Sequence, residues 1–264
     1  MWHIKYTLHI TDKTMPGTLY LIPNTLGQTD GAADDLLSYI IPHQVQRITA
    51  SLDYFVAENA KSTRAFLKLV AATHALAKPL QEINIAELNV NTPIAALPAL
   101  LAPILAGQDA GLISEAGVPA VADPGANLVR LAHQHGIQVR PLVGPSSLLL
   151  AVMASGLNGQ SFAFNGYLPT DTGLRAKRIK ALEDRSRQEK QTQLFIETPY
   201  RNGAMLEALA TTCLPDTLIC IATDLTLPSE SIRTQAAAKW RRTLDAGEIP
   251  AFHKKPTVFL LLTQ

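Results

Sequence analysis

The sequence predicts an α/β protein, and three observations support that prediction. Short apolar, β-branched runs bounded by turn residues recur along the chain, as strands do. Segments in which apolar residues follow helical spacing separate these runs. Apolar residues make up 47% of the 264 residues and charged residues 17%, so the chain is apolar enough to fold around a core. Alternation of strands and helices along one chain is typical of α/β architecture.

Nine segments are expected to be strands. The first, 18–22, is apolar and ends at Pro23, and the second, 53–57, is also an apolar run. The other expected strands are residues 83–88, 110–113, 137–143, 162–164, 193–196, 218–221 and 258–262.

Seven segments are expected to be helices, at residues 62–74, 92–106, 125–135, 146–155, 175–190, 202–212 and 236–246. In the first of them, Phe66, Leu69 and Val70 lie on one face. The second is rich in Ala and Leu but is interrupted by Pro98 and Pro103.

The clearest Gly/Pro turn signal in mid-chain is Val143-Gly144-Pro145, which predicts a domain boundary. We expect an N-terminal α/β domain over residues 15–143 and a C-terminal α/β domain over residues 144–264. Residues 1–14 precede Met15, an alternative start, and are expected to be a dispensable extension.

The net charge of +1 argues against a protein that coats nucleic acid by bulk electrostatics. The charge is uneven, however. Residues 1–132 hold 8 basic and 11 acidic groups, whereas residues 133–264 hold 15 and 11. Residues 175–190 alone hold seven basic and three acidic groups. That helix either contacts a polyanion or is a solvated helix with i,i+4 ion pairs.

Composition also indicates the compartment. Cys213 and Cys220 are too few for a disulfide framework, which favours a reducing cytoplasm. No stretch of about 18 uninterrupted apolar residues occurs, so no membrane span is expected. Residues 1–14 have no apolar core and no small-residue cleavage site, unlike a signal peptide.

Several familiar motifs are absent from the sequence. There is no G-x-x-x-x-G-K-[ST] and no G-x-G-x-x-G after the first expected strand, which weighs against an NTPase or a nicotinamide dehydrogenase. No G-x-S-x-G elbow occurs. His133 and His135 lie two apart, on different faces of a helix, and the other histidines and cysteines show no metal-ligand spacing.

Three loops follow expected strands in the first half, at residues 22–28, 56–61 and 113–125. Ligands of parallel α/β folds bind at the carboxyl ends of strands, and these loops occupy such positions. Each also has a purely structural explanation. Pro23 and Gly27 suit a turn, Glu58 suits a helix cap or solvent, and Asp123-Pro124 suits a helix start. Further along the chain, Ser146 suits a helix N-terminus.

Six motifs follow one another along residues 17–262: Gly17-Thr18-Leu19-Tyr20-Leu21-Ile22-Pro23, Ser114-Glu115-Ala116-Gly117-Val118-Pro119, Asp123-Pro124-Gly125, Gly144-Pro145-Ser146-Ser147, Gly166-Tyr167-Leu168-Pro169 and Glu197-Thr198-Pro199-Tyr200-Arg201. Taken in order and spacing, these motifs resemble one family: the tetrapyrrole-methylase-type S-adenosylmethionine-dependent methyltransferases. The sequence is most similar to their bacterial branch that methylates a cytidine ribose 2′-hydroxyl in small-subunit ribosomal RNA.

The resemblance implies two α/β domains with the cofactor, S-adenosyl-L-methionine, in the cleft between them, a homodimer, and RNA of the small ribosomal subunit as the substrate. It implies no metal. The cofactor-binding positions that it implies are Leu26, Gly117, Val118, Val121, Ser146, Ser147, Ile196, Ala222, Pro256 and Thr257.

The acceptor site departs from the family pattern. The ribosomal branch has Glu-Asp-Thr-Arg in the second loop, where this chain has Glu58-Asn59-Ala60-Lys61. Asn59 cannot act as a base, and Lys61 cannot form the bidentate fork that Arg makes with phosphate. The first loop has Asn24-Thr25 and Gln28 in place of Thr-Pro and Asn, and the third has Glu115-Ala116 in place of Asp-Ala.

Glu58 is the candidate catalytic residue, as an acid/base or positioning group. Asn24, Lys61 and Arg201 are the candidate substrate-binding residues. Glu197 and Arg201 follow an expected strand, and they either face the cleft or form a structural ion pair.

Three functional hypotheses follow. The first is a methyltransferase acting on RNA, which the motif set and the basic second half favour. The second is a methyltransferase acting on a small tetrapyrrole-like acceptor, which requires several basic groups in the cleft. The third is a cofactor-binding module weakened in catalysis, which the altered second loop suggests.

Overall fold

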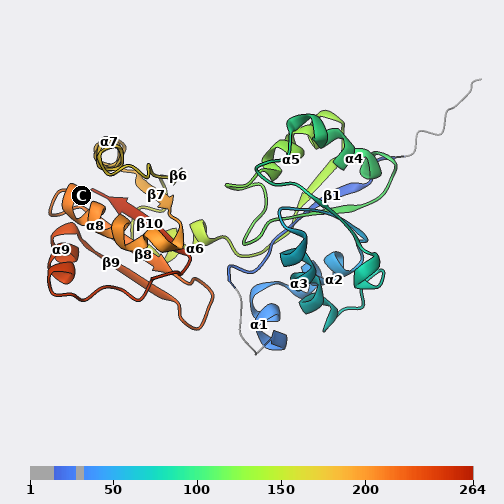
Figure 1. The fold of residues 1–264 in the computed structure, drawn as a ribbon, viewed down its shortest axis with the longest axis horizontal. Coiled ribbons are helices and arrows are strands. Elements are labelled where there is room, and N and C mark those ends of the chain that lie inside the picture. The colour runs from blue at the N-terminus through green and yellow to red at the C-terminus, as the bar shows by residue number, and fades with distance from the viewer. Residues whose placement is uncertain (1–14, 28–32, 264) are drawn as a thin grey trace, which may run out of the picture. The chain divides into compact units, whose positions relative to one another are not determined.

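The computed structural model describes residues 15–27 and 33–263 (Figure 1). The predicted extension at residues 1–14 and the variant position Gln28 lie outside the described residues. The described chain divides into two compact units. Residues 15–22, 44–115 and 119–143 form the first unit, and residues 23–27, 33–43, 116–118 and 144–263 form the second.

The first unit contains a five-stranded parallel sheet in the order β3-β2-β4-β1-β5. Its strands are β1 (Thr18–Ile22), β2 (Tyr54–Ala57), β3 (Asn84–Glu87), β4 (Ala110–Ile113) and β5 (Gln138–Pro141). Every residue of β2 and β4 is buried, as expected of central strands covered on both faces. Because the strands are parallel, their carboxyl ends share one edge of the sheet.

Helices cover this sheet on both faces (Figure 1). The helices are α2 (His43–Ala50), α3 (Ala60–Ala71), α4 (Leu97–Leu105) and α5 (Gly125–Gln134), and short 3-10 turns occupy Leu80–Glu82 and Ile94–Ala96. Leu101, Ile104 and Leu128 pack with Leu19 and Leu112 in one fully or nearly fully buried cluster. The core of this unit therefore joins α4 and α5 to the central strands.

The second unit contains a mixed sheet in the order β6-β7-β10-β8-β9. Its strands are β6 (Phe162–Tyr167), β7 (Thr192–Ile196), β8 (Leu218–Thr223), β9 (Ser231–Ala236) and β10 (Thr257–Leu262). Only β6 and β7 pair in parallel, whereas β10 runs antiparallel to both β7 and β8.

Side-chain alternation along the strands gives the second unit two apolar layers. Phe259 and Leu261 of β10 pack with the helices α7 (Thr172–Glu189), α8 (Asn202–Thr212) and α9 (Ala237–Asp245). Val258 and Leu260 point to the other face and pack with α6 (Ser147–Ser155). A further helix, α1 (Ala33–Ile40), belongs to the same unit.

The predicted α/β class is confirmed, and all the expected helices and strands have counterparts. The sequence prediction missed α1, α2 and β9. Strand β9 is polar, with Gln235 its only buried residue, so no apolar run marks it. The expected helix 92–106 is shorter, because Pro98 lies in the first turn of α4 and a 3-10 turn precedes it. No described helix is long and apolar enough to cross a membrane.

Candidate active site

The second loop, residues 56–61, is hydrogen-bonded to the third loop, residues 113–125, at the edge of the first sheet where the carboxyl ends of the strands lie. The Glu58 backbone N–H donates to the Ile113 carbonyl over 3.1 Å, and the Glu58 Oε2 accepts from the Glu115 N–H, also over 3.1 Å. Glu58 follows β2, and its two partners are the last residue of the neighbouring strand β4 and a residue of the loop after it. The candidate catalytic carboxylate is half-buried and held by backbone on this edge.

Asn59, and not Glu58, caps the following helix. Its Oδ1 accepts from the N–H of Lys61 at 2.9 Å and of Ser62 at 3.2 Å, in the manner of a side-chain N-cap. The cap alternative for Glu58 is therefore wrong. Because Asn and Asp are about equally good caps, the exchange of the family's Asp for Asn59 keeps the start of α3 intact. Lys61 lies in the first turn of α3 and is exposed.

Asp123 organises the third loop through both carboxylate oxygens. Oδ2 accepts from the Ala120 N–H at 2.7 Å, and Oδ1 accepts from the Gly125 N–H at 2.6 Å. Ala120 and Ala122 have φ of 64° and 60°, a left-handed conformation that is costly for alanine. The structural alternative for Asp123-Pro124 makes Asp123 the N-cap and Pro124 the first helical residue. In the structure α5 begins at Gly125 and Pro124 occupies the cap position, while Asp123 still binds the first helical N–H.

Burial raises the pKa of Asp123, and the nearby Glu58 charge raises it further. Two backbone hydrogen bonds oppose this shift without cancelling it. A carboxyl with a raised pKa at the ligand edge of an α/β sheet is a candidate functional group. Sequence reasoning placed Asp123 in a candidate ligand loop, with a helix start as the structural alternative, but assigned it no role in the site. Desolvation has no local sequence signal. Val121, a predicted cofactor residue of the same loop, is 47% exposed.

In the second unit, the first loop and Gly117 form a close backbone contact. The Asn24 N–H donates to the Gly117 carbonyl at 2.8 Å, and the Gly117 N–H donates to the Thr25 carbonyl at 3.4 Å. Gly117 has φ of 67°, and a Cβ there would lie 3.0 Å from Leu26 Cδ2 and 3.4 Å from the Pro145 carbonyl oxygen. Only glycine fits this position without strain.

Asn24 itself is buried, and its Oδ1 accepts from the Thr25 N–H at 2.8 Å. Val118 follows Gly117 and is half-buried. The structure thus brings three predicted residues, Leu26, Gly117 and Asn24, into one local cluster.

An apolar wall adjoins this cluster. Val258 of β10 pairs with Ile196 of β7 on one side and with Ala222 of β8 on the other. Ile196 and Leu26 are only half-buried and pack against the cluster that contains Ala222 and Val258. Residues far apart in sequence therefore present partly exposed apolar side chains from one surface, as the resemblance implies.

Ser146 and Ser147 lie at the start of α6, in the same unit. Ser146 is the N-cap, and its hydroxyl accepts from the Leu149 N–H at 3.5 Å. The structural explanation for Ser146 is thus present in the fold. The first amides of a helix have no partner within the helix, so the N–H of Ser147 is among those that are free to bind an anionic group.

The Pro256-Thr257 pair is held by a buried polar network. The Asp224 N–H donates to the Pro256 carbonyl at 3.0 Å, and the Thr257 hydroxyl lies 3.1 Å from Asn202 Nδ2 and 3.2 Å from the Thr223 hydroxyl. The Thr257 side chain is therefore internal, and its cofactor role stays a prediction.

An ion pair with a buried carboxylate, missed by sequence reasoning, lies beside this network. The Asp224 carboxylate, 5% exposed, pairs with Lys255 Nζ at 2.8 Å and accepts from the Ser229 hydroxyl at 2.7 Å. Asp224 also has φ of 51°. A polar residue directly after an apolar strand was the only sequence signal, and many surface turns share it.

Arg201 and Glu197 form the ion pair that the sequence offered as the structural alternative. An Arg201 nitrogen contacts Glu197 Oε2, and the Glu197 side chain is 1% exposed. Glu197 Oε1 also accepts from the Thr198 N–H at 2.7 Å. Arg201 remains 30% exposed, so part of its guanidinium reaches the surface.

The described residues give no support for a cysteine nucleophile or for a metal centre. Burial raises the pKa of the Cys213 thiol to about 12, the Glu183 charge adds to the shift, and burial also raises the pKa of Cys220. Neither thiol is a ready nucleophile at neutral pH. Within residues 15–27 and 33–263, no three His, Cys, Asp or Glu side chains gather as metal ligands.

The residues of the second unit fit S-adenosylmethionine, which combines a sulfonium, an adenine and an amino-acid end. Leu26 and Ile196 offer apolar contact, and Gly117 offers backbone that no Cβ covers. The start of α6 suits a carboxylate. None of the predicted cofactor residues carries a cationic side chain that would repel a sulfonium.

Comparison with solved structures identifies the fold. Methyltransferase CobJ aligns over 94% of both chains with a TM-score of 0.58 and 18% identity. The cobalamin biosynthetic enzyme cobalt precorrin-4 methyltransferase, CbiF, aligns over 93% of this chain and 94% of its own, with a TM-score of 0.55 and 13% identity. The protein thus has the fold of the tetrapyrrole methylases.

Curated relatives give the family, although no protein-family model matches the sequence. Ribosomal RNA small subunit methyltransferase I of Xylella fastidiosa is 30% identical over 82% of this chain and 71% of its own. The Vibrio cholerae protein of that name is 27% identical over 86% and 73%. The Mesorhizobium japonicum protein of that name is 42% identical over 52% of this chain but only 45% of its own length.

The chain belongs to the ribosomal RNA small subunit methyltransferase I family. It is an enzyme, a methyltransferase whose cofactor is S-adenosyl-L-methionine, and these predictions from the sequence are confirmed.

Proposed function

We propose that this enzyme transfers a methyl group to a ribose 2′-hydroxyl in the RNA of the small ribosomal subunit. The observation that carries the proposal is the shared name of its relatives, which align over most of this chain. The basic second half of the sequence also favours a polyanionic substrate over a neutral one.

The cofactor-binding residues of the proposal are those implied by the resemblance, and most of them lie in the second unit. Leu26, Ile196 and Ala222 would contact the apolar parts of the cofactor, and Gly117 and Ser147 would offer backbone groups. When bound, S-adenosylmethionine supplies an electrophilic methyl group on a positively charged sulfur. Val118, Val121, Ser146, Pro256 and Thr257 complete the proposed set.

Glu58 is the proposed acid/base group. A ribose hydroxyl is a weak nucleophile, and a carboxylate that accepts its proton strengthens it. The structure supports this role in one respect: Glu58 is fixed by backbone at the ligand edge of its sheet. Asn24, Lys61 and Arg201 are the proposed substrate contacts, with the exposed Lys61 suited to a phosphate.

We also propose that the enzyme acts in the cytoplasm, as two buried, unpaired cysteines and a ribosomal substrate favour, and that it is a homodimer.

The proposal is tested by methyl transfer to purified small ribosomal subunits that lack 2′-O-methylation. The enzyme is incubated with S-adenosylmethionine carrying a labelled methyl group, and the RNA is digested to nucleosides. We expect label in 2′-O-methylcytidine. The Xylella fastidiosa relative, treated identically, is the positive control. Calorimetry with S-adenosylmethionine and S-adenosylhomocysteine measures cofactor binding separately.

Two outcomes would contradict the proposal. Tight cofactor binding without label in RNA, while the relative is active, would favour a module that has lost turnover. Label in a carboxylate-rich tetrapyrrole but not in RNA would favour the small-acceptor alternative.

A further inference from the structure

The charges of helix α7 are divided between its two halves. Residues 172–182 contain Arg175, Lys177, Arg178 and Lys180 and no acidic residue. The acidic residues of the helix, Glu183, Asp184 and Glu189, all lie in its second half.

In the second half, the cations are neutralised within the helix. Arg185 pairs with Glu189 at 3.2 Å and Arg187 pairs with Asp184 at 3.0 Å. Glu183 is buried, and its Oε1 accepts from the Leu214 N–H at 2.7 Å. The expected solvated helix with local ion pairs is therefore realised in the second half of α7.

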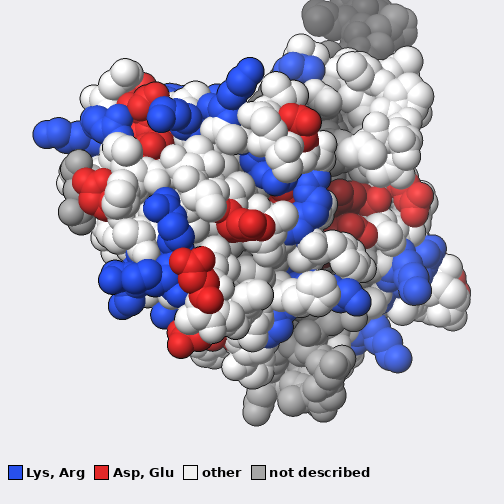
Figure 2. All heavy atoms as spheres, turned by 60° about the vertical axis from the view of Figure 1, so that its left-hand side comes forward, with Lys and Arg blue, Asp and Glu red and all other residues white. Residues whose placement is uncertain are grey.

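The first half differs. Arg175 points inward, is 7% exposed, and donates to the Thr170 carbonyl at 3.3 Å. Lys177, Arg178 and Lys180 are exposed, and within the described part of the chain no ion pair involves any of them. Figure 2, which brings this side of the molecule forward, shows Lys and Arg gathered in several groups with acidic side chains between them.

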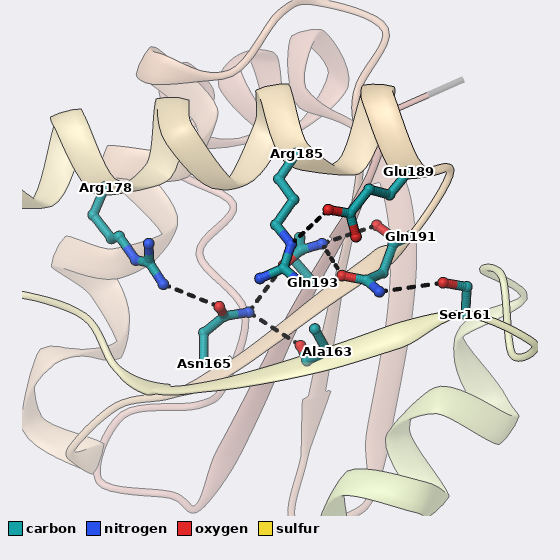
Figure 3. A network of polar contacts seen from close by, with 8 residues as sticks. All are labelled: Ser161, Ala163, Asn165, Arg178, Arg185, Glu189, Gln191 and Gln193. Carbon is teal, nitrogen blue, oxygen red and sulfur yellow. Dashed lines mark hydrogen bonds and ion pairs between the residues drawn. The ribbon is translucent and has the colours of Figure 1, made fainter.

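Arg178 is held in place by a neutral partner. Its guanidinium donates to Asn165 Oδ1 at 3.1 Å, from α7 across to the edge strand β6 (Figure 3). Asn165 is itself fixed, because its Nδ2 donates to the Ala163 carbonyl at 3.0 Å and to Gln193 Oε1 at 3.1 Å. An amide orients the guanidinium without cancelling its charge and leaves most of its five N–H donors available.

The same edge strand leads to the predicted cofactor wall. Tyr167, two residues after Asn165, is 61% exposed and pairs in register with Ile196 of β7. We call Lys177, Arg178, Lys180, Asn165 and Tyr167 the α7–β6 surface. Its α7 part carries cations that have no acidic partner among the described residues, and its β6 part carries an exposed aromatic ring. The Arg178–Asn165 hydrogen bond joins the two parts, and β6 pairs with β7, the strand of the predicted cofactor residue Ile196.

We propose that the α7–β6 surface binds the phosphodiester backbone of the substrate RNA. This inference rests on the proposed function. Proteins bind single-stranded nucleic acid by combining cations that contact phosphates with aromatic rings that stack on bases, and this surface offers both kinds of side chain. Such contacts position the RNA without reading its sequence.

The test compares two double variants of the same helix. Lys177→Gln/Lys180→Gln removes unpaired cations, and Arg185→Gln/Arg187→Gln removes two cations that acids already neutralise. Binding of a labelled small-subunit RNA fragment is measured by fluorescence anisotropy over a series of salt concentrations. We expect the lysine variant to bind about tenfold more weakly and its salt slope to fall by roughly 1.5. We expect the arginine variant to stay within about twofold of the wild type.

Cofactor affinity by calorimetry and thermal unfolding by circular dichroism, both expected to be unchanged, show that the variants are folded. Equal RNA affinity and equal salt slope in the two double variants would contradict the proposed RNA-binding role of the α7–β6 surface. A wild type that binds no RNA would contradict it as well. A wild type that binds RNA through these lysines but methylates none would leave the surface standing and would contradict the proposed function instead.

Discussion

The Glu58 carboxylate accepts a hydrogen bond from the Glu115 N–H at 3.1 Å, although 57 residues separate them in the sequence. Glu58 follows β2 and Glu115 follows β4, and these strands are neighbours in the parallel sheet. The bond therefore ties together two loops at the edge where parallel α/β folds bind their ligands. A carboxylate fixed in this way is pre-oriented for a role in the chemistry.

The substitution Glu58→Gln tests whether this carboxylate acts as a base or only as a tie. Glutamine keeps an oxygen that can accept from Glu115 but cannot take a proton at neutral pH. We expect kcat to fall about 100-fold with cofactor affinity unchanged, since general-base catalysis contributes at least that much. Steady-state methyl transfer and calorimetry measure the two quantities.

Glu87→Gln is a matched control for Glu58→Gln. Glu87 ends β3 on the same sheet edge, and its Oε1 also accepts from a backbone N–H, that of Ala60, at 3.2 Å. We expect kcat of this variant to remain within twofold of the wild type. A Glu58→Gln variant with nearly normal kcat would assign Glu58 a positioning role alone.

Asn59 offers a prediction about stability that is separate from catalysis. Asn59→Ala removes the side chain that caps α3, so the free energy of unfolding should fall by about 1 kcal/mol. Asn59→Asp keeps the cap and places a negative charge at the helix N-terminus, so it should be neutral or stabilising by about 0.3 to 1 kcal/mol. Urea denaturation of both variants measures this. Equal losses in the two would show that Asn59 Oδ1 is not an effective cap.

Most of the fold could be predicted from the sequence because its signals are local. Apolar runs such as Leu218–Thr223 mark central strands, and helical spacing marked Asn202–Thr212 at both ends. Strand β9 was not predicted, because Ser231–Ala236 lies at a sheet edge where a strand needs few buried apolar side chains. The N-cap preference for Asn could have identified Asn59, since that signal is local too.

The site was harder to predict than the fold because its interactions are tertiary. The tie from Glu58 to Glu115 and the pair between Asp224 and Lys255 depend on which strands become neighbours. The raised pKa of Asp123 depends on burial. None of these has a pattern within a short stretch of chain.

The raised pKa of Asp123 predicts a dependence of stability on pH. Because the folded state holds the proton more tightly than the unfolded chain, the contribution of Asp123 is fully present below the ordinary value of 3.8 and is lost as pH rises through the raised pKa. The difference in unfolding free energy between wild type and Asp123→Asn should therefore shrink as pH rises above about 4.

The pH dependence of stability expected from Asp53 has the opposite sign and serves as a comparison. The hydrogen bond from Lys78 and a second one from Gln108 lower the pKa of Asp53, so its contribution is present above 3.8 and is lost as pH falls through the lowered pKa. The difference between wild type and Asp53→Asn should therefore grow as pH rises toward 4. Urea denaturation of the three proteins from pH 3 to 7 measures both trends, and parallel trends would contradict the assignment to Asp123.

Gly117 allows the candidate cofactor cluster to be separated from simple backbone strain. Gly117→Ala forces alanine to φ of 67° and places its Cβ 3.0 Å from Leu26 Cδ2. Gly156→Ala forces alanine to φ of 69° at the far end of α6, where no atom lies within 4 Å of the new Cβ. Both variants should lose about 1 to 2 kcal/mol of unfolding free energy, the cost of a left-handed alanine. Only Gly117→Ala should also displace Leu26, so calorimetry should show at least fivefold weaker binding of S-adenosylmethionine to it. Equal cofactor affinity in the two variants would remove Gly117 and Leu26 from the proposed cofactor site.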